Sequence, residues 1–190
     1  MDKKWLSRLA VIVEARHGKE VCERVFGDIY SVEKNHAAKA AWFERFTSGM
    51  DDLDDKEFLA NMMADNCPCG GGSEREAIKL RENYNKSETL EDFVAMTKFG
   101  DKKKLVGNVL YLTKNKTRRK NMGQIAQGCW CELAGHADKY VSDIFCYCCT
   151  VGHTGKAFKK AFGDDTRVEF VESLIVGGKG CTVAIHLPVK

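Results

Sequence analysis

Residues 167–187 read RVEFVESLIV-GGKG-CTVAIHL, and this stretch decides the fold class. Two runs rich in β-branched and other apolar residues, Arg167–Val176 and Cys181–Leu187, flank the glycine-rich segment Gly177–Gly180. Runs of this kind joined by a short glycine-containing turn are typical of β-hairpins. The sequence therefore predicts a β-hairpin at the C-terminal end.

The residues before this hairpin predict a mixture of further elements. Residues 155–162 indicate a short helix that ends at Gly163, and residues 106–113 indicate one more strand. Residues 114–120 are strongly basic and are typical of a solvated turn, while residues 122–149 show no regular period. The C-terminal half is thus expected to combine helix, strand and irregular structure.

The N-terminal half predicts helices. Trp5, Leu9 and Ile12 share one face of a first helix, and three further segments up to Met63 show similar spacing. One of these ends at Gly49. Ser73 with Glu76 forms a capping box that begins a short charged helix, and residues 87–100 indicate another.

Together these elements predict an α+β protein, with an N-terminal helical segment followed by a mixed α/β domain that ends in a β-hairpin. The composition change places the boundary between a helical region, 1–104, and a cysteine-rich region, 105–190. A single compact unit is the alternative, because 190 residues suit one domain.

Composition narrows the classes of function. Hydrophobic residues make up 44% and charged residues 30% of the chain, which excludes a disordered protein. The net charge of +3 gives no argument for a nucleic-acid or membrane partner. No apolar run is long enough for a signal peptide core or a membrane span, so we expect a cytoplasmic protein.

Nine cysteines are the most informative residues. In a reducing compartment, they indicate thiols, metal ligands or redox chemistry rather than disulfides, and their odd number favours the same interpretation. Cys22 and Cys181 stand alone. The others include three Cys-x-Cys units, namely Cys67-Pro68-Cys69, Cys129-Trp130-Cys131 and Cys146-Tyr147-Cys148, the last followed at once by Cys149.

Paired thiolates point to a soft metal, and zinc usually takes four tetrahedral ligands. We predict that Cys129 and Cys131 share a site with Cys146 and Cys148, and that Cys67 and Cys69 contribute to it or form a separate site. An iron–sulfur cluster would use the same sulfurs and stays open. Cys-x-Cys matches the common Cys-x2-Cys spacing only weakly, and burial as small apolar side chains is the alternative.

A nucleophilic thiol is the rival interpretation. Cys148 and Cys149 precede a helix expected to start near His153, and a helix N-terminus together with an imidazole activates a thiol. The predicted catalytic residues are therefore Cys148, Cys149 and His153. The alternative for His153 is a cap or surface residue in a glycine-rich turn.

The last third to half of the chain resembles a known group. Its features, in order, are the cysteine-rich run Phe145–Cys149, Gly152, Phe162-Gly163, the strand Val168–Ile175, Gly177-Gly178, Cys181 and Ile185–Pro188. This set resembles the 4-vinyl-reductase-like and L-2-amino-thiazoline-4-carboxylate hydrolase-like proteins, most of all a bacterial and archaeal branch of them. The resemblance implies an α+β domain with a ligand pocket closed by the terminal hairpin.

In sensor members of that group, cysteines and a glutamate near the hairpin hold a structural zinc. The resemblance matches Cys181 to the last of these cysteines, and Cys146 or Cys148 to the first. Ser173 stands where the middle cysteine would be, and Phe170 stands where the glutamate would be, with Glu169 and Glu172 beside it. This departure argues against a zinc site of the sensor type.

Three functions follow as expectations. The first is a small-molecule-binding protein with a cysteine-based metal site, most simply zinc. The second is a thiol-dependent hydrolase of a small cyclic amide or thiazoline-type substrate. The third is a non-enzymatic regulator that binds a protein partner through its N-terminal helices. The sequence leaves open whether the chain is an enzyme and whether it forms a homodimer.

Overall fold

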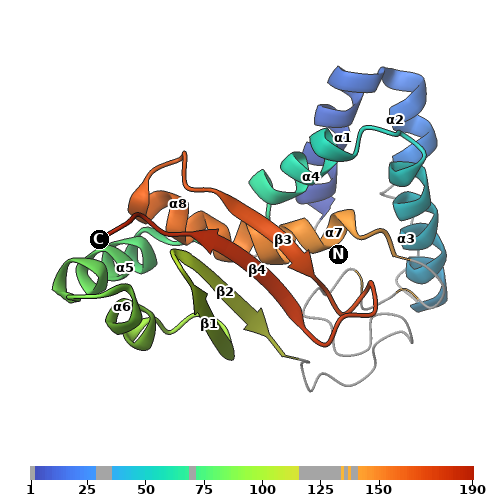
Figure 1. The fold of residues 1–190 in the computed structure, drawn as a ribbon. Helices are drawn as coiled ribbons and strands as arrows, with labels where there is room; N and C mark the ends of the chain where they lie inside the picture. The colour runs from blue at the N-terminus through green and yellow to red at the C-terminus, as the bar shows by residue number, and fades with distance from the viewer. Residues whose placement is uncertain (1–2, 29–35, 69–71, 116–133, 135–136, 138–140) are drawn as a thin grey trace.

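The computed structural model describes residues 3–28, 36–68, 72–115, 134, 137 and 141–190 (Figure 1). Helices dominate the N-terminal part, and the strands form one four-stranded antiparallel sheet in the order β1-β2-β4-β3. The last two strands pair with each other as the expected C-terminal hairpin. The predicted α+β class is therefore confirmed.

Four helices build the N-terminal part: α1 (Lys3–His17), α2 (Lys19–Phe26), α3 (His36–Asp51) and α4 (Lys56–Asp65). Their apolar sides share one core cluster, in which Trp42 and Phe46 stack with ring centroids 5.1 Å apart. Trp42 Nε1 also donates to the Phe26 carbonyl oxygen (3.0 Å). The predicted helical character of this part is confirmed.

Gly49 does not end α3, as the sequence suggested, but lies inside it. A Cβ atom at this position would come within 3.3 Å of the backbone of Val25 in α2. The glycine is therefore explained by the close approach of two helices rather than by a helix end.

Two capped helices follow, α5 (Glu74–Lys86) and α6 (Leu90–Met96). The capping box at Ser73 and Glu76 is confirmed, with the Ser73 N–H donating to Glu76 Oε2 (2.8 Å). The second helix begins later than expected, because Thr89 and Asp92 form a capping box of their own. Ser87 instead donates its hydroxyl to the Asn83 carbonyl oxygen (2.6 Å) at the end of α5.

The sheet consists of β1 (Lys102–Val106), β2 (Val109–Lys114), β3 (Val168–Glu172) and β4 (Cys181–His186). The strand predicted over residues 106–113 is confirmed from Val109 onward as β2, but its start is wrong, because the chain turns at Gly107, which has φ +58°. Val106 pairs with Val109 across this tight turn. Sequence patterning missed β1 because it begins with three lysines, a composition that suits an edge strand.

The expected strand over residues 167–176 is also shorter in the structure. Pairing with β4 shifts register between Phe170 and Glu172, and β3 ends there. The Gly178 N–H then donates to the Ser173 carbonyl oxygen (2.8 Å), which closes a turn before β4 begins. The hairpin connection is therefore longer than the glycine-rich segment alone.

One continuous helical run crosses the molecule and passes behind the sheet in Figure 1. It consists of α7 (Ile144–Tyr147), the π-helix η2 (Cys148–Gly155) and α8 (Lys156–Phe162). The prediction of irregular structure up to Cys149 is thus wrong for its last residues, and the helix predicted over 155–162 begins earlier. Among the described residues, no helix is long and apolar enough to cross a membrane.

The two core clusters meet along this helical run. Phe145 and Cys148 belong to the cluster of the N-terminal helices, whereas Ala157 and Phe158 belong to the cluster between the sheet, α5 and α6. Each cluster includes residues from both sides of the predicted boundary at 104/105. The helical run therefore joins the two halves of the described fold.

Candidate functional site

The π-helix is the most unusual element near the predicted site residues. π-Helices are rare, and they occur frequently at functional sites. Two glycines allow this one to pack closely on both sides. A Cβ atom at Gly152 would collide with the backbone of Ala64 in α4, and one at Gly155 would come within 2.7 Å of the Val168 side chain in β3.

The neighbouring cysteines of this helix lie in different surroundings. Cys148 is buried in the N-terminal core cluster, to which Cys146 does not belong. A helix turns by about 200° over two residues, so Cys146 and Cys148 leave it on opposite sides. The predicted use of this pair as joint ligands of one ion is therefore not supported by their placement.

Cys146 contacts the terminal hairpin. Its Sγ donates to Ser173 Oγ over 2.9 Å, and both residues are buried, with Ser173 fully inaccessible. The Val176 N–H donates to the same hydroxyl (3.4 Å). Ser173 therefore connects the helical run to the turn between β3 and β4.

Cys149 lies beside the end of β2. Lys114 Nζ donates to the Cys149 carbonyl oxygen (3.3 Å), although 35 residues separate the two positions. Lys114 also pairs with Cys181 across β2 and β4, and residues paired in this way point to the same face of a sheet. Cys181 thus faces the helical run near Cys149.

Cys149 and His153 are the half-buried members of the predicted catalytic set, whereas Cys148 is buried. Residues four apart lie on one side of a helix. Burial alone would raise the pKa of Glu76, but hydrogen bonds from Ser73 and the charge of His153 lower it. His153 is therefore near enough for its charge to act on a carboxylate at the start of α5, and it shares one side of the helix with Cys149.

The expected activation by a helix N-terminus is wrong. Cys148 and Cys149 do not precede a helix, because the helical run already begins at Ile144. The partial positive charge of a helix end falls off within the first turn. Any activation of Cys149 must therefore come from side chains such as His153 and Lys114.

Of the other cysteines predicted as metal ligands, only Cys67 lies within the described residues. Cys67 is half-buried and packs against the N-terminal core cluster. Cys69, Cys129 and Cys131 lie outside the described residues. Within residues 3–28, 36–68, 72–115, 134, 137 and 141–190, no three histidine, cysteine, aspartate or glutamate side chains are grouped so that they could hold a metal ion.

The residues at the positions matched to the sensor-type zinc site make contacts of other kinds. Phe170 faces the helical run, where its ring lies 5.1 Å from that of Tyr147. The neighbouring carboxylates point to the opposite face of the sheet, where Glu169 meets His186 (2.6 Å) and Glu172 accepts from Thr182 (2.9 Å). Neither glutamate therefore joins Cys146 and Cys181.

A depression of about 590 Å³ opens near the start of the helical run. Its size is in the range of small-molecule pockets. Ile144, Leu59 and Ile175 provide apolar walls, and Asp51, Asp54, Asp55, Lys56 and Asp143 provide charges. None of the described cysteines lines it, so this depression is separate from Cys67, Cys146, Cys148, Cys149 and Cys181.

Sequence patterns missed Lys114 as a member of the site. It was assigned to a solvated basic turn, but it is the last residue of β2 and reaches the helical run. Its contact is long-range, so no local pattern indicates it. The spacing Gly152-x-x-Gly155 is the one signal that could have indicated a tightly packed helix here.

The described fold is an α+β protein in which a thiol-bearing π-helix packs between an N-terminal helical layer and an antiparallel sheet. The chain belongs to a family of unknown function, DUF6144, whose model matches residues 8–189. No curated protein and no solved structure matches the chain.

Proposed function

We propose that this chain is a cytoplasmic, thiol-dependent protein that acts on a small molecule, with Cys149 as nucleophile and His153 as its base. The observation that carries the proposal is the placement of both side chains, half-buried, on one side of the π-helix. The resemblance of the C-terminal half to thiazoline-carboxylate hydrolases suggests a small cyclic amide or thiazoline-type substrate.

The chemistry is that of a covalent hydrolase. The Cys149 Sγ–H gives its proton to His153, and the sulfur bonds to the carbonyl carbon of a cyclic amide. The carbon–nitrogen bond then breaks, and His153 returns the proton to the leaving nitrogen. Water cleaves the resulting thioester, which releases the acid and restores the thiol, so that no oxidant or reductant is needed.

Lys114 supports the thiolate in this scheme. Its ammonium group lies at the Cys149 backbone (3.3 Å from the carbonyl oxygen), and a nearby cation favours an ionised thiol. Cys148 has no such role, because it is buried among apolar side chains. The proposal therefore assigns reactivity to one of the two adjacent thiols.

We expect Cys149 to be alkylated faster than the other described cysteines in the native protein. Iodoacetamide labelling followed by peptide mapping measures each thiol separately. Cys22 is the slow reference, because burial, with the charges of Glu14 and Glu23, raises its pKa and its Sγ donates to the Ala10 carbonyl oxygen (3.3 Å). We expect Cys149 to exceed it by about a hundredfold.

Cys67 is the matched control for this labelling, because it is also half-buried but packs against apolar side chains. Rapid labelling of Cys149 together with slow labelling of Cys67 would show that the Cys149 thiol is activated and not merely accessible to the reagent. Equal rates for the two thiols would reject the proposal.

A soft-metal site is the second candidate. The pairing of Lys114 with Cys181 places the Cys181 thiol on the side of the sheet that faces Cys149, although no three ligand side chains among the described residues are grouped to hold an ion. Zinc, or an iron–sulfur cluster, would need further ligands, for which Cys129 and Cys131 are the candidates. Metal analysis of protein purified under reducing, anaerobic conditions tests this directly, and a metal content near zero rejects it.

A further inference from the structure

One face of the sheet, called here the outer face, has none of the described helices packed on it (Figure 1). The opposite face carries the core residues Leu110, Leu112, Val183 and Ile185. Because neighbouring residues in a strand point to opposite faces, the residues between these point outward. The outer face is therefore a candidate surface for a partner.

The strand register orders the outer face into rows. One row runs from Lys102 in β1 through Thr113 and Thr182 to Glu172 in β3. The next row runs from Lys104 through Tyr111 and Ala184 to Glu169. Each row thus begins with a lysine at one edge of the sheet and ends with a glutamate at the other.

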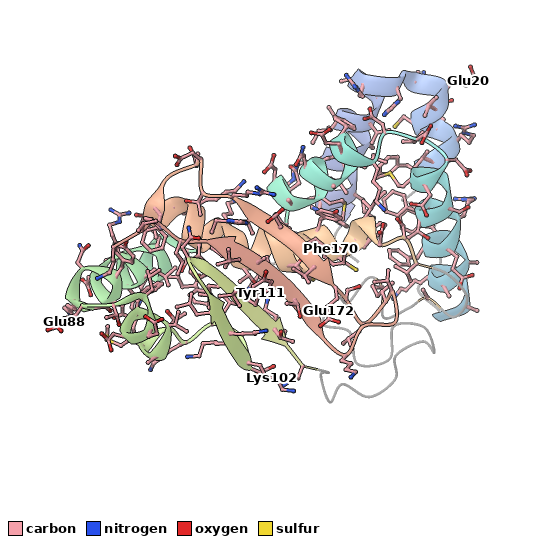
Figure 2. All side chains as sticks on the ribbon, in the orientation of Figure 1. Glu20, Glu88, Lys102, Tyr111, Phe170 and Glu172 are labelled. Carbon is pink, nitrogen blue, oxygen red and sulfur yellow. The ribbon has the colours of Figure 1, made fainter. Side chains whose placement is uncertain are left out.

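Figure 2 shows Lys102 at the lower end of β1 and Glu172 toward the opposite edge of the sheet. Both lysines are exposed, and both glutamates are partly exposed. Glu169 already pairs with Arg167 and with His186 (2.6 Å each), which offsets its negative charge. The charge of Glu172 is offset less. The outer face therefore has a positive edge at β1, and the negative charge at its β3 edge lies mainly at Glu172.

We propose that the outer face binds a second copy of this chain, related by a two-fold axis parallel to the strands. Such an axis reverses the strand order, so that β1 lies over β3 of the partner. Lys102 then faces the partner's Glu172, and Lys104 faces the partner's Glu169. A surface that complements itself in this way is the requirement for a two-fold interface.

The charges also decide between the two possible directions of the axis. An axis perpendicular to the strands would instead set β1 against β1 and oppose lysines to lysines. Charge therefore selects one arrangement.

The surface area sets the strength of the association. Four strands of this length present about 350 Å² of flat surface, less than the roughly 800 Å² per partner of a standard interface. We therefore expect a weak dimer that forms at micromolar or higher concentrations and weakens with salt, because exposed charges are screened.

Sedimentation velocity of the full chain over a broad concentration range tests the proposal. We expect Lys102→Glu and Glu172→Lys, each alone, to raise the dissociation constant at least about tenfold, because each opposes like charges twice in a two-fold dimer. Lys160→Glu is the matched control, since this exposed lysine lies on α8, behind the sheet, and should leave dimerisation unchanged.

An equal mixture of the Lys102→Glu and Glu172→Lys chains should restore dimerisation, because both charge pairs are then opposite in sign. Lys102 is exposed on an edge strand, so its variant alone tests the proposal if the other does not fold. A wild-type chain that stays monomeric at every concentration overturns the proposal. A dimer that is indifferent to Lys102→Glu, or folded variants that do not combine, overturns it equally.

Discussion

Replacing Phe145 with alanine is expected to lower the free energy of unfolding by about 3–5 kcal/mol. Phe145 is 1% exposed and makes edge-to-face contacts with Phe43 (5.0 Å) and Phe46 (5.4 Å). Removal of the ring takes away its apolar burial and leaves a cavity that the surrounding rings fill only partly.

Urea unfolding followed by circular dichroism measures this loss. Val11→Ala is the control, because Val11 is 66% exposed on α1 and its replacement should change stability by less than about 0.5 kcal/mol. Since Phe145 anchors the helical run to the N-terminal helices, a loss below about 1 kcal/mol would contradict the described packing of the two layers.

Gly152→Ala is expected to lower the free energy of unfolding by about 2–3 kcal/mol, although alanine is the better helix former. The added Cβ would collide with the Ala64 carbonyl oxygen, and its next contacts are also backbone atoms of Ala64, at 3.0 Å. Backbone cannot rotate out of the way as a side chain can. The helical run would therefore have to shift relative to α4, together with Cys149 and His153.

Gly155→Ala is the matched control within the same π-helix. Its Cβ would meet the side chain of Val168 at 2.7 Å, and a side chain can adjust more readily than backbone. We expect a loss about half as large or smaller, as judged from urea midpoints. If Gly152→Ala were as stable as the wild type, the close approach of the π-helix to α4 would be disproved.

Local patterns predicted the local elements well. Trp5 and Leu9 mark an apolar helix face, and Ser73 with Glu76 marks a helix start, because a few neighbouring residues determine each feature. The terminal hairpin was equally visible, since both of its strands are apolar and glycines separate them. These elements needed no knowledge of long-range contacts.

The helical run could not be predicted from the sequence, because long-range contacts and not neighbouring residues stabilise it. Residues 148–155 contain glycine, threonine and cysteine, which are weak helix formers, so propensity argues against a helix. Packing of Gly152 on α4 and of Gly155 on β3 stabilises it instead. Tertiary contacts of this kind are not readable from spacing.

The candidate site was partly predictable. Cys149 and His153 were identified from their proximity in sequence, but which thiol is accessible depends on the direction in which the helix faces. The sequence also gave no indication that Cys146 would contact Ser173 or that Lys114 would reach Cys149. Both contacts join segments that only the folded chain brings together.

The most direct test of the central claim is the alkylation rate of Cys149 at neutral pH in the wild type and in His153→Gln. If His153 is the base for Cys149, its loss should slow alkylation at least about tenfold. His186→Gln, which alters a half-buried histidine on the outer face of the sheet, should leave the rate unchanged. Equal rates in the wild type and His153→Gln would contradict the proposed pair.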